Sequence, residues 1–285
     1  MLRARLGADA TIEALDWGKA VRIGEVTVTF HPAGHILGSA QVRVESHGEV
    51  WVVSGDYKIE ADSTCRAFEP IRCDTFITES TFGLPIYRWR PEPEVLGEVN
   101  EWWRRNQNDG KASVLFAYAL GKAQRLLSGL DVGIGPVFCH GAVERLNRIY
   151  RANGVALPET LYAQDAPKGF DWSRALIIAP PSTSGSIWLR RFGTVSTGFA
   201  SGWMRIRGTR RRRSIDRGFV LSDHADWPGL LGAIRDTGAQ SVKVTHGYRA
   251  PLVRWLCEQG LDAEALETRF EGERDEGDDL EEAES

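Results

Sequence analysis

The feature that most constrains the fold is an alternation of short apolar segments with amphipathic ones in the middle of the chain. Between about residues 91 and 201, strand candidates lie at 114–118, 137–139, 176–179 and 195–199, and helix candidates lie near 122–130, 143–152 and 183–191. Strands that alternate with helices are joined by crossovers and form a mostly parallel sheet. The sequence therefore predicts an α/β layer here.

The segments on either side follow other patterns. Short β-rich runs at 26–30, 41–45, 49–53 and 75–78 are separated by Gly, Pro and Asp, which is typical of sheet. Later in the chain, strand candidates at 219–222 and 242–245 alternate with helix candidates near 227–236 and 251–259. Asp226 precedes Trp227 and Pro228, so we expect an N-cap with proline in the first turn.

The net charge of −4 conceals two regions of opposite sign. Residues 271–285 hold nine acids and one Arg, and we expect this tail to be disordered because it has too few apolar side chains to offset the entropy of ordering. The densest basic stretch is 205–217, which contains one acid, Asp216. Such a stretch indicates either a surface for a polyanion or a solvated loop.

We expect neither a membrane span nor a secretory leader in this sequence. No apolar run approaches the roughly 18 residues that a span needs, and the first residues form no unbroken apolar segment. Cys65, Cys73, Cys139 and Cys257 show no CxxC spacing, so we predict buried reduced thiols. We expect a cytoplasmic protein without membrane contact.

Five short polar motifs stand at the ends of the strand candidates, where active sites are commonly built. They are HPAGH at 31–35, SGD at 54–56, TES at 78–80, SDHAD at 222–226 and THG at 245–247. Histidine and carboxylate suit zinc and manganese, and a water between such ions becomes a nucleophile near neutral pH. Each motif also has a structural explanation, because Asp56 can be a turn residue and Asp226 a helix cap.

A phosphate-binding loop is excluded at Gly121 and Lys122. No Gly stands at the required earlier position, and Ala123 replaces the Ser or Thr of that motif. The backbone there could still face a phosphate at a helix start. Trp102, Trp103 and Trp188 lie at helical spacing among apolar residues, and we expect them in the core.

Read in order, the segments HPAGHILGSAQ, SGDYK, TFITESTFG, ASGWM, LSDHADWPGL and VTHG resemble the β-CASP branch of the metallo-β-lactamase fold. They look most like the bacterial ligase-associated DNA exonucleases. The resemblance covers about residues 21–260 and implies an α/β protein, a metallo-β-lactamase αββα sandwich that is incomplete at its N-terminal side and carries an inserted α/β β-CASP domain. The implied divisions are 1–90 and 202–268 for the metallo-β-lactamase domain, 91–201 for the insertion, and 269–285 for the acidic tail.

The resemblance also implies a role for each site residue. His35 would bind a first zinc, Asp56 would bridge the two ions, and His246 would bind the second. Glu79 would orient His224, which would protonate the leaving oxygen after attack by a hydroxide that two zinc ions activate, with manganese as the alternative metal. The nucleic-acid backbone would be held by Lys122, Arg205, Arg207, Arg210, Arg211, Arg212 and Arg213.

One family motif has no counterpart in this chain. HxHxDH lies ahead of the HPAGH segment in the family, whereas no histidine precedes His31 here. Four metal ligands are therefore missing, and a catalytic zinc site normally has three protein ligands. The same part would supply the first strands, so we expect an uncovered face on the sheet and interpret Met1 as an internal methionine of a longer chain.

The leading functional hypothesis is a metal-dependent DNA exonuclease in DNA repair, linked to an ATP-dependent DNA ligase and a helicase. One alternative is a noncatalytic, truncated β-CASP protein that binds nucleic acid. Another is an exonuclease that processes RNA 3′ ends. His246 favours RNA, because some DNA-cutting relatives have an apolar residue there, but the closer likeness to the ligase-associated group favours DNA. A small-molecule metallohydrolase would leave the α/β insertion without a role.

Overall fold

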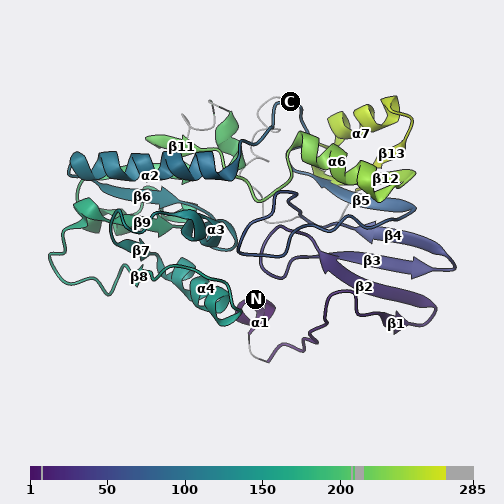
Figure 1. Cartoon of the computed structure of the whole chain (residues 1–285), viewed down its shortest axis with the longest axis horizontal. Coiled ribbons are helices and arrows are strands. Elements are labelled where there is room, and N and C mark those ends of the chain that lie inside the picture. The colour runs from purple at the N-terminus through teal and green to yellow at the C-terminus, as the bar shows by residue number, and fades with distance from the viewer. Residues whose placement is uncertain (8, 207, 209–214, 268–285) are drawn as a thin grey trace.

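The computed structural model contains two sheets that lie side by side, each with its own helices (Figure 1). It describes residues 1–7, 9–206, 208 and 215–267. The seven-stranded sheet has the order β1 (Val21–Ile23), β2 (Val26–Pro32), β3 (Ala40–Ser46), β4 (Glu49–Val53), β5 (Thr75–Ser80), β12 (Ser241–Gly247) and β13 (Asp262–Ala265). The six-stranded sheet has the order β11 (Arg217–Phe219), β10 (Val195–Ala200), β6 (Ala112–Phe116), β9 (Leu176–Ala179), β7 (Val137–Cys139) and β8 (Leu161–Tyr162).

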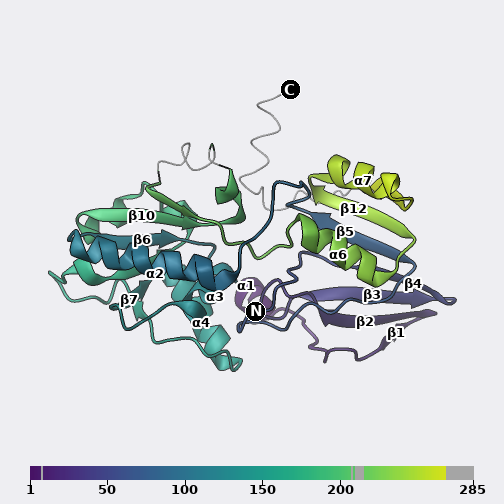
Figure 2. The ribbon, with the colours of Figure 1, turned by 45° about the horizontal axis from the view of Figure 1, so that its top comes forward.

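Six α-helices accompany the two sheets in the described part of the chain. They are α1 (Leu2–Leu6), α2 (Glu92–Asn108), α3 (Lys122–Gly129), α4 (Gly141–Ala152), α6 (Trp227–Thr237) and α7 (Arg249–Glu258). Helices α2, α3 and α4 lie with the six-stranded sheet, and α6 and α7 lie with the seven-stranded sheet (Figures 1 and 2).

The seven-stranded sheet is half antiparallel and half parallel. Strands β1 to β4 pair antiparallel, whereas β4, β5, β12 and β13 pair parallel. The turn between β3 and β4 has positive φ at both of its residues, 52° at His47 and 84° at Gly48, as a tight type I′ hairpin requires. This turn sets the register of β4 and therefore the position of the SGD motif beyond it.

One face of this sheet packs against α6 and α7. Val52, Phe76 and Val242 occupy matching register positions on three neighbouring strands, and all three are fully buried. They share a core with Leu230 of α6 and Leu252 of α7. Burial of these side chains fixes the strands whose ends carry the site described below.

The opposite face of the same sheet is apolar and partly open to solvent. Ile23, Trp51 and Val53 are 65%, 40% and 37% exposed. The β3–β4 register aligns Val44 with Trp51 and Val42 with Val53, so apolar side chains continue across this face. Their exposure agrees with the expectation of an uncovered sheet face, which is a typical sign of an interaction surface.

The six-stranded sheet is parallel throughout, which confirms the predicted α/β layer. Trp102 and Trp103 of α2 are 5% and 0% exposed and lie in its core, as predicted. Strand β11 pairs with β10 in this sheet, whereas the implied domain division placed residues 202–268 with the other sheet. The chain thus adds β11 as the edge strand of the six-stranded sheet and then returns to the seven-stranded sheet.

Three local predictions need correction. The predicted helix at 183–191 is instead two short 3₁₀ segments, Pro181–Thr183 and Ile187–Phe192, because serines compete for backbone hydrogen bonds and Gly185 has a φ of 71°. The strand predicted at 219–222 lies earlier, as β11. Cys73 and Cys139 are buried free thiols, but Cys257 is exposed.

The predicted start of the helix after Asp226 is confirmed. Helix α6 begins after Asp226, whose side chain accepts the backbone N–H of Gly229 at 2.9 Å, and Pro228 lies in its first turn. Among the described residues, none of the helices combines the length and apolar character that a membrane crossing needs. The acidic tail predicted at 269–285 lies outside the described residues.

Candidate active site

Five of the predicted site residues come together around the strand ends of the seven-stranded sheet. His35 follows β2, Asp56 follows β4, and Glu79 lies near the end of β5. His246 lies near the end of β12, and His224 lies in the loop between β11 and α6. The pairing of β4 with β5 and of β5 with β12 brings these distant segments to one edge of the sheet.

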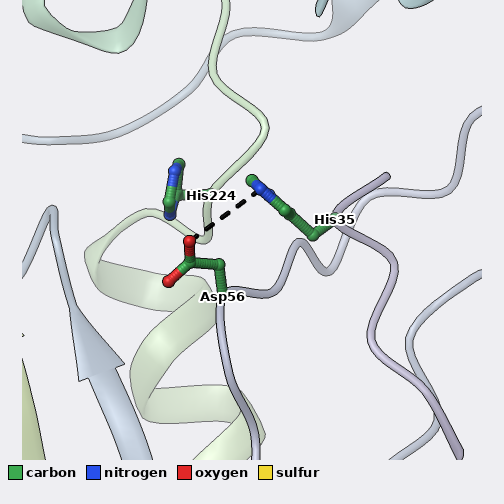
Figure 3. A group of neighbouring side chains, drawn as sticks. All are labelled: His35, Asp56 and His224. Carbon is green, nitrogen blue, oxygen red and sulfur yellow. Dashed lines mark ion pairs between the residues drawn. The ribbon is translucent and has the colours of Figure 1, made fainter. Parts of the chain in front are cut away.

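Asp56 lies at the centre of the group. Its Oδ1 is 3.0 Å from Nε2 of His246, and its Oδ2 is 3.9 Å from Nε2 of His35. Gly55, with a φ of 58°, provides the turn that carries the carboxylate off the end of β4. Figure 3 shows the Asp56 carboxylate directed toward the rings of His35 and His224. One carboxylate therefore lies between a histidine that follows β2 and a histidine of β12, as a bridging ligand would.

His35 is held by its second ring nitrogen. Nδ1 donates a hydrogen bond to the backbone carbonyl of Asp223 at 2.8 Å, which leaves Nε2 directed at Asp56. Burial and the nearby His224 lower the pKa of His35. A neutral imidazole with its orientation fixed by a backbone acceptor is the state that metal binding requires.

His224 and Glu79 form a buried pair. Nδ1 of His224 lies 2.8 Å from Oε2 of Glu79, and the other carboxylate oxygen accepts the backbone N–H of Tyr57 at 2.7 Å. Burial alone would lower the pKa of His224, but the charge and hydrogen bond of Glu79 outweigh it and raise the pKa to about 9. His224 is therefore protonated at neutral pH, with Nε2 free of this bond.

The hydrogen bond between Asp56 and His246 lowers the pKa of the carboxyl and raises the pKa of the imidazole. Burial favours the neutral carboxyl, yet the hydrogen bond from His246 and the nearby histidines hold the pKa of Asp56 below its usual range. The same hydrogen bond raises the pKa of His246. Because a metal ion must displace the proton of His246, binding at this position becomes weaker as the pH falls.

Two groups of potential metal ligands share Asp56. The ligand atoms of His35, Asp56 and His224 lie within 4.8 Å of one another, and so do those of Asp56, Glu79 and His246. Imidazole nitrogen and carboxylate oxygen are the donors that zinc and manganese take. Since Glu79 and His224 bond to each other, His35, Asp56 and His246 fit the metals best. Together they offer two imidazole nitrogens and a carboxylate to a metal ion.

Lys122 lies in the interior rather than on a surface that nucleic acid could reach. Its side chain is 4% exposed, and Nζ lies 3.3 Å from Oδ2 of Asp223. Arg125, one turn further along α3, contacts the other oxygen of Asp223 at 3.2 Å. A buried cation that neutralises Asp223 is not available to a phosphate, so this placement does not support the predicted contact of Lys122 with nucleic acid.

Buried charged side chains connect the two sheets and their helices. Arg125 also contacts Glu92 of α2 at 2.5 Å and Asp62 at 3.8 Å, and Lys58 pairs with Asp62. Lys122 and Arg125 of α3 pair with Asp223, and the backbone carbonyl of Asp223 holds His35. A helix of the six-stranded sheet therefore supports a site residue of the seven-stranded sheet.

Loss of the Lys122 charge is expected to destabilise the fold. Lys122→Met leaves Asp223 buried with one cation fewer, and breaking a buried ion pair from one side costs about 3–5 kcal/mol. Urea unfolding measures this change. Lys111→Met is the matched control, because its pair with Asp109 is 41% and 59% exposed and contributes at most about 1 kcal/mol. Equal losses of unfolding free energy in both variants would show that the buried Lys122–Asp223 pair is not important for stability.

The predicted basic surface is described only in part. Arg205 is exposed, and its Nε donates to the backbone carbonyl of Ile86 at 3.2 Å. Arg217 pairs with Glu98 at 3.4 Å. The remaining predicted contacts lie outside the described residues; they are Arg207, Arg210, Arg211, Arg212 and Arg213.

Sequence reasoning missed Asp223 and Arg125 as parts of this region. The available indications were an acid directly before His224 and two basic residues three positions apart at the start of a helix. Spacing alone does not reveal that these charges meet, because they lie 98 positions apart in the chain.

The chain is similar to two kinds of known protein. A probable DNA ligase from Opitutus terrae is 33% identical over 272 residues, which is 93% of this chain and 26% of that protein. Endoribonuclease ysh1 from Schizosaccharomyces pombe is 35% identical over 130 residues, 44% of this chain and 17% of that protein. Cleavage and polyadenylation specificity factor subunit 3 from Dictyostelium discoideum is 33% identical over 124 residues, which is 42% of this chain and 16% of that protein. The chain thus spans about a quarter or less of these relatives.

The fold also matches a solved structure. A protein of unknown function from Enterococcus faecalis V583 superposes with a TM-score of 0.57 at 11% identity, over 92% of this chain and 67% of that chain. No family model matches the chain. The motif order, the mixed α/β fold and the similarity to the endoribonucleases agree with one another. These similarities support a β-CASP nuclease of the metallo-β-lactamase fold as the family that this chain resembles.

Proposed function

We propose that the chain is a metal-dependent phosphodiester hydrolase, a DNA exonuclease that acts in DNA repair alongside an ATP-dependent DNA ligase. The observation that carries this proposal is the shared carboxylate. Asp56 contacts His246 at 3.0 Å and His35 at 3.9 Å, directly beside the His224–Glu79 pair. This set combines metal-binding donors with a positioned proton donor, and both kinds of group accelerate phosphodiester hydrolysis.

Each residue has a defined task in this proposal. His35, Asp56 and His246 hold two zinc ions, with manganese as the alternative, and bound ions would supply an activated water and neutralise charge on the phosphate. His224 donates the proton to the leaving oxygen from Nε2, because Nδ1 is bonded to Glu79. Buried Glu79 keeps that ring charged and oriented until the proton is needed.

DNA is the proposed substrate because of the relative that covers most of the chain. The protein from Opitutus terrae that aligns over 93% of this chain carries the name probable DNA ligase. A nuclease that trims DNA ends and a ligase that joins them act on the same termini. This supports a functional link between the two activities, and a link to a helicase stays a prediction.

The domain division is also a proposal. We propose that residues 91–201 form the inserted β-CASP domain and that residues 1–90 and 202–268 form the metallo-β-lactamase part. The parallel sheet built by β6 to β10 supports an insertion of this extent. Strand β11 joins it from outside that range.

RNA is the second candidate substrate, since the relatives that align with 42–44% of the chain include endoribonucleases. His246 is the residue that favours it in the sequence. End-labelled single-stranded DNA and RNA of the same sequence, mixed with the metal-loaded protein, test the choice directly. Faster loss of DNA supports our proposal, and faster loss of RNA would replace DNA by RNA in it.

A noncatalytic role makes a different prediction about metal. If the chain only binds nucleic acid, the native protein should contain close to no zinc, whereas the proposed enzyme requires about two zinc ions per complete site. Elemental analysis of the protein purified from its own cells therefore separates the two functions.

The arginines at 210–213 are expected to contribute salt-dependent binding. Arg210→Gln combined with Arg211→Gln should weaken binding to single-stranded DNA and reduce the slope of log K against log salt by about 0.7 for each lost phosphate contact. Fluorescence anisotropy at several salt concentrations measures the slope.

The matched control for this double variant removes the same charge elsewhere. Arg235 and Arg254 lie on α6 and α7 with 78% and 82% of their side chains exposed. Arg235→Gln combined with Arg254→Gln should leave the slope unchanged. If both double variants change it equally, net charge rather than a defined contact explains the binding.

A further inference from the structure

Five aromatic rings gather where the ends of β5, β10 and β12 meet. We call this cluster the aromatic shelf; its members are Phe82, Tyr87, Trp89, Trp203 and Tyr248. The Phe82 ring centroid lies 4.8 Å from those of Tyr87 and Trp89 and 4.7 Å from that of Trp203. Tyr248 lies 5.9 Å from Tyr87 and 6.3 Å from Trp203. The rings form one continuous group.

The shelf has a buried inner part and a partly exposed outer part. Phe82 and Tyr87 are 2% and 0% exposed. Trp89, Trp203 and Tyr248 are only half-buried. The inner rings therefore support the outer ones from below, and the outer ones keep apolar surface available to a ligand.

The shelf adjoins the candidate active site. The Phe82 ring lies 6.1 Å from the ring of His224, and Nε1 of Trp89 donates to the backbone carbonyl of His224 at 2.9 Å. Tyr248 stands two residues after His246, and its backbone N–H donates to the carbonyl of Ser80 at 2.8 Å. A molecule bound against the shelf is thus next to the residues that would carry the chemistry.

Two glycines permit this arrangement. A Cβ on Gly202 would lie 2.5 Å from the Phe82 ring, so the loop that carries Trp203 reaches the ring only with glycine there. Gly247 has a φ of 87°, and a Cβ on it would lie 2.4 Å from the backbone of Ser80. The shelf therefore joins a loop of the six-stranded sheet to the strand ends of the other sheet at close range.

A positive charge borders the shelf. Arg205 is exposed, and its Nε donates to the carbonyl of Ile86, the residue before Tyr87. Aromatic faces combined with a nearby cation are the features with which proteins hold single strands, because bases stack on the rings while the cation meets the backbone.

We propose that Trp203 and Tyr248 stack an unpaired base of a single-stranded DNA end next to the phosphate that is cleaved. This inference rests on the proposed function and adds that the enzyme recognises single strands rather than duplex ends. A base in the interior of a duplex has both faces covered by its neighbours, so it cannot lie against the shelf without being unpaired.

Binding of oligonucleotides that each lack one base tests the stacking site. The protein is kept in EDTA so that DNA is bound without metal-dependent cleavage, and affinity for single-stranded DNA is measured by fluorescence anisotropy with one abasic position moved along the strand. Wild-type protein should lose about tenfold to a hundredfold in affinity at one position. Trp203→Leu should lose a similar amount on intact DNA and become insensitive to the abasic position. Trp203→Phe should restore both the affinity for intact DNA and the sensitivity to the abasic position.

Controls separate stacking from folding. Trp51 is 40% exposed on the open face of the seven-stranded sheet, and Trp51→Leu should keep the affinity and the abasic profile of wild-type protein. Circular dichroism shows whether Trp203→Leu is folded, and Tyr248→Leu provides a second test. Unchanged binding by folded Trp203→Leu, a flat abasic profile in wild-type protein, or equal affinity for blunt duplex would overturn the proposal. A protein that shows the shelf pattern yet never cuts DNA would refute the proposed function alone.

Discussion

His224→Ala should lower the rate of DNA cleavage by about a hundredfold to ten-thousandfold while the bound metal stays near its normal level. The reason is the division of tasks in the site. Nδ1 of His224 is bonded to Glu79 rather than to Asp56. Removal of the His224 ring therefore takes away a proton donor and leaves the proposed metal ligands in place. Single-turnover rates and elemental analysis on the same preparation measure both quantities.

A surface histidine serves as the control. His47 has 77% of its side chain exposed, and asparagine tolerates its φ of 52°, so His47→Asn should keep full activity. Loss of metal from His224→Ala would show that this residue is a ligand, and our division of tasks would be wrong.

The same pair predicts the pH dependence of cleavage. Glu79 raises the pKa of His224 to about 9, so the proton donor is charged below that pH and is lost as the pH rises through it. Glu79→Gln removes the charge that raises the pKa, and the fall in rate on the alkaline side should move to lower pH. A pH–rate profile that is identical in both proteins would contradict the coupling.

Asp56→Ala should abolish cleavage and release the metal together. Asp56 belongs to both groups of potential ligands, so its loss should affect both of the proposed ions at once, and activity should fall to the level of the EDTA-treated protein. Zinc content and cleavage rate measure the effect. Asp131→Ala is the control, because Asp131 pairs with Arg104 at the surface with 49% of its side chain exposed. Full metal content in Asp56→Ala would remove Asp56 from the site.

Much of the fold follows from local patterns in the sequence. The alternation of strand and helix between residues 91 and 201 predicts the parallel sheet, since each crossover helix must cover the strands it joins. The cap at Asp226 gives the start of α6 because the carboxylate and the backbone N–H that it accepts lie only three residues apart. Such features depend on neighbours in the sequence.

The arrangement of charges within the site depends on distant residues instead. Lys122 stands at a helix start with no acid nearby in the sequence, and only the fold brings Asp223 to 3.3 Å from its Nζ. The aromatic shelf likewise combines residues from 82 to 248. The 3₁₀ segments at 181–192 escaped prediction because apolar spacing there resembles a helix while the serines and Gly185 oppose it.

The most direct test of the account is the cleavage of end-labelled single-stranded DNA by protein purified from its own cells, followed before EDTA, after EDTA, and after zinc or manganese is restored. We expect stepwise shortening from one end that stops in EDTA and returns with the metal. Cleavage that continues in EDTA, or protein that holds two zinc ions and leaves both DNA and RNA intact, would contradict it.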